Sequence, residues 1–298
     1  MFSKIGKKCL VVLCCFVFLV CGCGQQKASG EKLNVTVTVF PIYDFVRAVG
    51  GDLVDITLLI KPGAEIHSFD PKPSDIVAVE NADLFIKIGG ESEEWAEKIG
   101  ASEEKTVKMM DCVKLISEEG HHDEYDEHIW TSHSNAVLMI EKICERLTQA
   151  DPENAEKYKA NALKYIGKIE EVSEKTAEVV EKSQSKFILV ADRFPFAYFA
   201  SEYGLNYAAA FGGCAVSTDI SVKVMNTLVG EIKEKNCKAV FYIEMSDKKI
   251  AQALREETGV KLLELHSAHN VTLDDFKSGI TYIDIIKNNL DSLERGIA

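Results

Sequence analysis

The chain has 298 residues, of which 46% are hydrophobic and 27% charged, and its formal net charge is −13 at pH 7. This length allows two domains with separate cores, and the composition is that of an ordinary globular protein. The acidic balance argues against nucleic acid as a partner, because phosphate groups attract Lys and Arg and repel a negative surface. A surface of this charge suits a protein that handles cations.

Residues 1–22 have the pattern of a lipoprotein signal peptide. Three lysines precede an apolar run over residues 9–20, which is short for a transmembrane helix. The run leads to Gly22 and Cys23, and this stretch resembles a bacterial lipobox. We therefore expect cleavage before Cys23, lipid attachment to its thiol, and a membrane-anchored protein on the extracytoplasmic face of the cell membrane. Cys21 as the anchor and an uncleaved anchor helix are the alternatives.

A polar tether over residues 23–32 leads into an alternation of strand-like runs and helical patterns. Strands are predicted at residues 35–39, 55–60 and 84–88, and helices at 42–49 and 74–81. Strands that alternate with helices indicate βα units and largely parallel sheets. We assign residues 33–150 to an N-terminal lobe.

The segment 151–185 is predicted to form one long helix. Asp151 and Pro152 are typical of a helix start, with an acidic N-cap and a proline at the first helical position. Apolar and small residues then recur at steps of three and four as far as Lys182, and Gly167 is the one unfavourable residue in the run. A coiled-coil segment is the alternative, but a single rigid helix between two α/β lobes fits the pattern better.

The alternation restarts after residue 186 and defines a C-terminal lobe over residues 186–298. Strands are predicted at residues 187–190, 238–243 and 261–265, and helices at 196–203, 222–235, 248–257 and 274–293. The predicted fold is therefore α/β, with two lobes of mostly parallel sheets linked by one long helix.

Four side chains fall where a ligand site is expected. His67, Asp192 and His266 follow predicted strands, and His128 lies just before a predicted helix. Ligands of open α/β sheets bind outside the carboxyl ends of strands, and two candidates come from each half, so a shared site would lie between the lobes. Three imidazoles and one carboxylate suit Zn²⁺, whereas more oxygen ligands would favour Mn²⁺.

Motifs for catalysis are missing from the sequence. There is no HExxH, no GxSxG and no glycine loop that could hold a phosphate. Four protein ligands would also leave no position for the water that a catalytic zinc needs, so we do not expect an enzyme. Outside the signal segment the cysteines show no CxxC pair, so they are core residues or form one disulfide: Cys112, Cys144, Cys214 and Cys237.

Several stretches resemble the zinc/manganese solute-binding lipoproteins of ABC importers. Residues 62–71 (PGAEIHSFDP) look like the first ligand motif of that family, and residues 126–130 (DEHIW) look like the second. Residues 151–158 resemble the start of its linking helix, and the resemblance extends from about residue 33 to the end. It implies a monomeric protein that holds a divalent metal ion, Zn²⁺ first and Mn²⁺ second, between its lobes and delivers it to an ABC permease and its ATPase.

The sequence departs from the family pattern at two ligand positions. The family usually has His or Glu five residues before the tyrosine that matches Tyr198, and here that residue is Arg193. The neighbouring Asp192 could replace it. The last family ligand is usually an acid, where this chain has His266. Glu244 is a further candidate carboxylate, or else a structural partner of Arg193.

Other histidines have weaker claims. His133 and His269 are expected to be neighbouring groups or alternative ligands, and His121 and His122 lie in an acidic run that resembles a shortened form of the family's His-rich loop. That run could capture metal or be an ordinary solvated loop. A surface adhesin or structural lipoprotein is the alternative function, and a zinc hydrolase is a less favoured one.

Overall fold

The structure is a computed structural model that describes residues 31–64, 69–99, 101–118, 121–213 and 220–297. The chain divides into two units, Met1–Glu31 and Lys32–Ala298, and the second contains every helix and strand described below. The predicted signal peptide, Cys23, His67 and Cys214 lie outside the described residues. No helix in the described part of the chain is long and apolar enough to cross a membrane.

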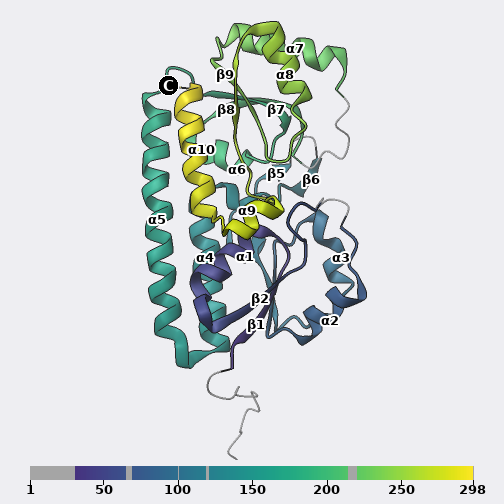
Figure 1. Ribbon diagram of the computed structural model, residues 1–298, viewed down its shortest axis with the longest axis vertical. Coiled ribbons are helices and arrows are strands. Elements are labelled where there is room, and N and C mark those ends of the chain that lie inside the picture. The colour runs from purple at the N-terminus through teal and green to yellow at the C-terminus, as the bar shows by residue number, and fades with distance from the viewer. Residues whose placement is uncertain (1–30, 65–68, 100, 119–120, 214–219, 298) are drawn as a thin grey trace, which may run out of the picture. The chain divides into compact units, whose positions relative to one another are not determined.

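The N-terminal part of this unit contains a parallel four-stranded sheet in the order β2-β1-β3-β4 (Figure 1). Its strands are β1 (Leu33–Val37), β2 (Val54–Leu58), β3 (Leu84–Lys87) and β4 (Thr106–Lys108). Its helices are α1 (Phe40–Gly50), α2 (Pro73–Asn81), α3 (Glu94–Glu97) and α4 (His133–Ala150). A short antiparallel pair, β5 (Ser117–Glu118) and β6 (His121–Tyr125), precedes α4.

The C-terminal part contains a second parallel sheet in the order β10-β9-β7-β8. Its strands are β7 (Phe187–Arg193), β8 (Asn206–Phe211), β9 (Ala239–Tyr242) and β10 (Lys261–Glu264). The helices here are α6 (Ala197–Tyr203), α7 (Val222–Glu234), α8 (Lys249–Thr258), α9 (Leu273–Ser278) and α10 (Tyr282–Ile297). The predicted fold class, two α/β lobes with parallel sheets, is confirmed.

The predicted linking helix is also confirmed. A 3-10 turn, Pro152–Asn154, runs directly into α5 (Ala155–Lys182), which has 28 residues and no break at Gly167. Asp151 fixes its first turns, because its carboxylate accepts hydrogen bonds from Asn154 Nδ2 at 2.7 Å and from the Tyr158 hydroxyl at 2.8 Å. The helix contacts α1, α4, α6 and α10 (Figure 1). It therefore packs against elements of both lobes.

The prediction of a single helix over residues 274–293 is wrong. Gly279 has φ 81°, a left-handed conformation that ends α9 before α10 begins. This turn lets α10 run alongside α5 (Figure 1). The apolar residues of its first turns, Tyr282, Ile283, Ile285 and Ile286, are buried in the same core as strand β1. The last helix of the chain thus completes the core of the N-terminal sheet.

A buried carboxylate joins the three helices at this point. Asp44 on α1 is 1% exposed and accepts hydrogen bonds from the Tyr165 hydroxyl of α5 and from Tyr282 N of α10, the latter at 2.7 Å. Arg47 supplies the opposite charge from Nε at 3.0 Å, and its Nη2 also donates to Ile280 O at 2.8 Å. A buried charge needs such partners to offset its desolvation. Asp44 therefore holds α1, α5 and α10 together.

Candidate metal centre

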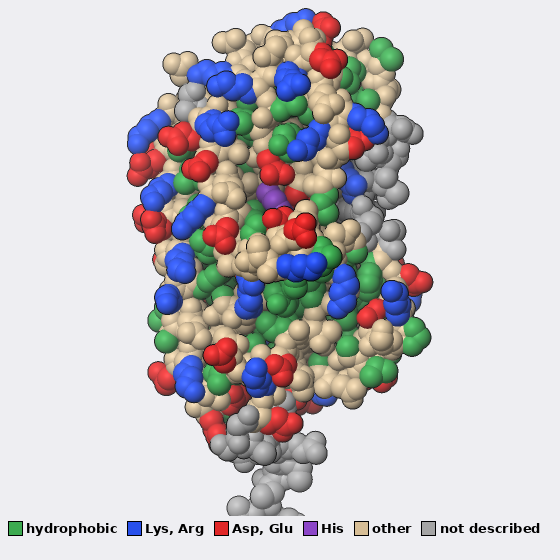
Figure 2. Space-filling model, viewed as in Figure 1, with side chains coloured by type: hydrophobic (Ala, Val, Ile, Leu, Met, Phe, Trp, Pro, Cys, Tyr) green, Lys and Arg blue, Asp and Glu red, His purple; other side chains and the backbone are tan. Residues whose placement is uncertain are grey.

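A cavity of about 120 Å³ lies where the β7, β9 and β10 ends meet loops of the N-terminal lobe. Four of its lining residues can coordinate a metal ion: His128, Asp192, Glu244 and His269. Figure 2 shows one face of the molecule, on which acidic and basic side chains are interspersed, and it does not label the cavity residues. The position agrees with the rule that ligands of open α/β sheets bind at the carboxyl ends of strands.

His128 has the geometry of a metal-binding histidine. It is 1% exposed, and its Nδ1 lies 3.0 Å from Asp126 Oδ1, which also accepts a hydrogen bond from His128 N at 2.7 Å. An ionised carboxylate can only accept, so Nδ1 carries the proton and Nε2 keeps its lone pair. Tyr198 in turn donates from its hydroxyl to Asp126 O at 2.9 Å. Such outer partners fix the tautomer and orientation of metal-binding histidines.

His269 lies beside His128, on the loop that follows β10. The two ring centroids are 5.0 Å apart with an interplanar angle of 86°, and the Trp130 ring packs 4.8 Å from that of His269. Ala268, the preceding residue, has φ 62° and so adopts a left-handed conformation. His269 N donates to Ser267 Oγ at 3.1 Å. This loop brings a second imidazole to the wall of the cavity.

The two acidic residues of the cavity differ in how their oxygens are used. Among the described residues, Asp192 accepts one bond at each oxygen, from Arg193 N at 2.8 Å and from the Ser246 hydroxyl. A carboxylate oxygen has two lone pairs, so each still has acceptor capacity. Glu244 is 8% exposed, and both its oxygens are bound by Ser267, through N at 2.7 Å and through the hydroxyl. Ser267 is therefore the hydrogen-bonding partner of Glu244, whose Oε2 also lies 3.6 Å from His266 Nδ1.

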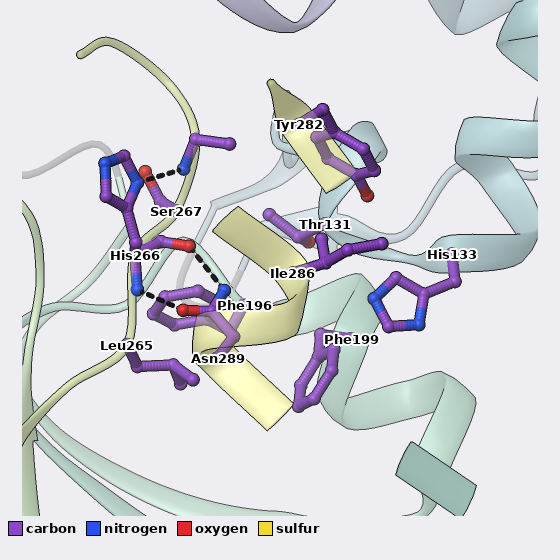
Figure 3. A pocket seen from close by; sticks show the side chains of 11 residues that line it. Thr131, His133, Phe196, Phe199, Leu265, His266, Ser267, Tyr282, Ile286 and Asn289 are labelled. Atoms are coloured by element: carbon purple, nitrogen blue, oxygen red, sulfur yellow. Dashed lines mark hydrogen bonds between the residues drawn. The ribbon is translucent and has the colours of Figure 1, made fainter. Parts of the chain in front are cut away.

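The structure does not bring His266 into this cavity. His266 lines a separate, smaller cavity of about 20 Å³ together with His133. Its Nδ1 accepts a hydrogen bond from Ala268 N at 2.9 Å, and Asn289 binds its backbone N and O, both at 2.8 Å. In Figure 3 its ring points away from His133 and from the middle of that pocket. The structure thus places His128, Asp192 and Glu244 on one cavity together with His269, and it places His266 on another.

The predicted ligand His67 lies outside the described residues. The chain reaches this segment at Ala64, which lines the cavity. Asn270 Nδ2 donates to Ala64 O at 2.8 Å and to Lys61 O at 3.1 Å, which ties this loop to the residue after His269. Within the described ranges, no group of three or more His, Cys, Asp or Glu side chains is placed to hold a metal ion.

His133 does not reach the cavity. It is 3% exposed, and its Nδ1 lies 2.6 Å from the Tyr203 hydroxyl. Burial lowers the pKa of His133 to about 4, and the carboxylate of Glu202 opposes this shift only in part. A neutral, buried histidine that joins α4 to α6 has a structural role. His121 and His122 begin β6, and Cys112, Cys144 and Cys237 are free thiols.

Two parallel α/β lobes on one long helix, with imidazoles and carboxylates at the strand ends between them, define the class of metal-binding solute-binding proteins. A family model described as zinc-uptake complex component A, periplasmic (ZnuA) matches residues 35–296. The chain belongs to this family. Its members are solute-binding components of ABC importers for metal and not enzymes, and they act outside the cytoplasm. The family favours this class over the adhesin and hydrolase alternatives.

Individual relatives agree with the family. The chain is 29% identical to the high-affinity zinc uptake system protein ZnuA of Bacillus subtilis strain 168, over 99% of this chain and 98% of that protein. It is 29% identical to the zinc-binding lipoprotein AdcA of Streptococcus pneumoniae, over 96% of this chain but 60% of AdcA, so it spans about three-fifths of that relative. The Zn(II)-bound ZnuA-like domain of the same AdcA superposes with a TM-score of 0.78 at 28% identity, over 90% of this chain and 99% of the domain.

Proposed function

We propose that this protein captures a single Zn²⁺ ion in the cavity beside His128 and His269 and delivers it to an ABC permease and its ATPase. The observation that carries the proposal is the pair of adjacent, buried imidazoles in a cavity that also holds Asp192. Nitrogen and oxygen donors in fourfold coordination suit Zn²⁺, and relatives across most of the chain are named for zinc. Mn²⁺ is the second candidate, since added carboxylate oxygens would favour it.

The proposed ligands are His67, His128, His269 and Asp192. His269 replaces His266 because its ring shares the cavity with His128, whereas His266 lines another cavity. His67 is kept because Ala64, three residues before it, lies on the cavity wall. Three neutral imidazoles and one carboxylate would leave Zn²⁺ with a net positive charge.

The proposed setting is the outer face of the cell membrane, where a monomer would be held by a lipid on Cys23. The basis is the sequence of residues 1–23, which has lysines, an apolar run and a small residue before the cysteine. Cys23→Ala should release the protein from the membrane fraction. Retention of this variant in the membrane would instead favour Cys21 or an uncleaved anchor helix.

The test of the function is metal analysis of protein purified without chelator, followed by chelator competition. We expect one Zn²⁺ per chain. His128→Ala and His269→Ala should each weaken binding by more than the roughly 10- to 100-fold that loss of an outer partner costs. His266→Ala, three residues away on the same loop, removes a hydrogen bond from Ala268 N and should weaken binding less than His269→Ala does. A protein without affinity for Zn²⁺ or Mn²⁺ would refute the function, and the reverse order of the two loop variants would refute the ligand set.

A further inference from the structure

We infer that the turn between β9 and α8 is a positioning element for two zinc ligands, His269 and Asp192, and that Glu244 in this turn acts through Ser267 and does not bind the metal. The inference rests on the proposed function. It assigns a role to residues 244–246, which lie on the wall of the cavity.

Glu244 holds the loop that carries His269. Ser267 N and the Ser267 hydroxyl donate to the two different oxygens of the Glu244 carboxylate. The same hydroxyl oxygen accepts a hydrogen bond from His269 N at 3.1 Å. Trp130 Nε1 donates to Ser267 O at 2.7 Å, so the N–H, the hydroxyl and the carbonyl of Ser267 all have hydrogen-bond partners. The path from Glu244 to the imidazole therefore runs through one buried serine, which is 4% exposed.

Ser246 holds the other ligand of the C-terminal lobe. Its hydroxyl donates to Asp192 Oδ2, and its oxygen accepts from Lys248 N at 3.2 Å. The second oxygen of Asp192 is bound by Arg193 N at 2.8 Å. One donor at each oxygen, counted over the described residues, fixes the plane of the carboxylate and leaves each oxygen a lone pair for a metal. Partners of this kind orient carboxylate ligands as they orient imidazoles.

The backbone of the turn makes both contacts possible. Met245 has φ 56° and Lys248 has φ 61°, which are left-handed conformations uncommon for residues other than glycine. Such strain persists only where the surrounding structure enforces it, and it is concentrated at functional sites. In this turn Glu244 and Ser246 both bond to ligand-bearing elements, while the intervening Met245 is 52% exposed at the cavity. The strained turn therefore serves the two ligands together.

The experiment is a double-mutant cycle on Zn²⁺ affinity, measured by chelator competition with the full chain. Glu244→Gln and Ser267→Ala should each weaken binding about 10- to 100-fold, the cost typical of an outer partner. Because both act on His269 through one path, the double variant should be no weaker than the worse single variant. Ser246→Ala should weaken binding through Asp192, and its effect should add to that of Glu244→Gln.

Visible absorption of bound Co²⁺ separates positioning from ligation. Glu244→Gln should keep the spectrum of a four-coordinate ion, as the control Glu264→Gln at the exposed end of β10 should, while His269→Ala should alter it. Ser267→Ala removes a single hydroxyl, so it still tests the path if Glu244→Gln fails to fold. Three outcomes would overturn this inference alone. They are additive losses of affinity for the Glu244 and Ser267 variants, unchanged affinity in both variants, and a Glu244→Gln spectrum like that of His269→Ala. An unaltered protein that binds no metal would overturn the proposed function as well.

Discussion

Glu93 is a buried carboxyl group whose replacement should stabilise the protein. It ends a 3-10 turn, Glu91–Glu93, and is 2% exposed. Its Oε2 accepts a hydrogen bond from Gly89 N at 2.8 Å, while its Oε1 and the nearby Thr38 hydroxyl do not meet the geometry of a full hydrogen bond. Burial raises the pKa of Glu93 to about 7, and the Thr38 hydroxyl and Gly89 N–H offset only part of this shift. The negative charge of Glu127 raises the pKa further.

The size of the effect follows from the two pKa values of Glu93, 4.5 as the ordinary value and about 7 in the fold. At pH values between these two pKa values, Glu93 keeps its proton in the folded protein but has lost it in the unfolded chain. The stability linked to this proton is therefore complete below pH 4.5 and is lost as the pH rises through the folded pKa. At about 1.36 kcal/mol per pKa unit, and with Glu93 half ionised in the fold at pH 7, the cost is about 3 kcal/mol at pH 7 and about 1 kcal/mol at pH 5.

Glu93→Gln removes this cost, because the amide is neutral at every pH and its oxygen can still accept from Gly89 N. Urea unfolding of the metal-free protein should show a gain of about 3 kcal/mol at pH 7 that shrinks to about 1 kcal/mol at pH 5. Glu94→Gln, at the exposed next residue, is the control and should change stability by less than about 0.5 kcal/mol. A loss of stability in Glu93→Gln, or a gain that does not depend on pH, would refute this reasoning.

Three further predictions concern Asp44, His133 and the pH dependence of Zn²⁺ binding. Asp44→Asn removes the charge that faces Arg47 and should lower the free energy of unfolding by about 3 kcal/mol in urea titrations; an unchanged value would show that the three-helix junction does not depend on the charge. His133 has a pKa near 4 in the fold, so its stability is complete above pH 6.5 and falls by about 3 kcal/mol as the pH drops toward 4; His133→Gln should flatten that part of an unfolding series against pH. Zn²⁺ affinity should fall below about pH 6.5, because protonated imidazole cannot bind metal. Equal affinities in competition titrations at about pH 7.5 and about pH 5.5 would contradict this prediction.

Most of the fold could be predicted because its elements carry strong patterns. The buried strands β3, β7 and β9 contain apolar runs, β1 alternates apolar with polar residues, and α5 keeps its period over 28 residues. Strands β4 and β8 were not predicted from the sequence. β4 has only three residues, and β8 carries three successive alanines, which have little preference for strands. Pairing to the neighbouring strands β3 and β7 fixes them instead.

The residues that line the cavity could be predicted only in part, because spacing does not reveal which way a loop side chain points. His266 and His269 lie on one loop, and both follow the strand at which a ligand was expected. The left-handed backbone at Ala268 changes the direction of the chain between them, so that His269 reaches the cavity and His266 does not. The sequence does not indicate that Ala268 adopts φ 62°, because alanine rarely has a left-handed conformation. The hydrogen bonds of Glu244 to Ser267 were equally beyond the sequence pattern.

The position of α10 has a consequence for how the chain is made. Tyr282 N bonds to Asp44 across 238 residues of sequence, and the apolar side chains beside it close the core around β1. During translation β1 and α1 are synthesised long before α10, so the first sheet leaves the ribosome without the helix that covers part of its core. The core of that sheet stays incomplete until α10 has been synthesised and its apolar side chains can pack against β1. Contacts of such long range slow folding, and they make the nascent chain slow to become compact while synthesis continues.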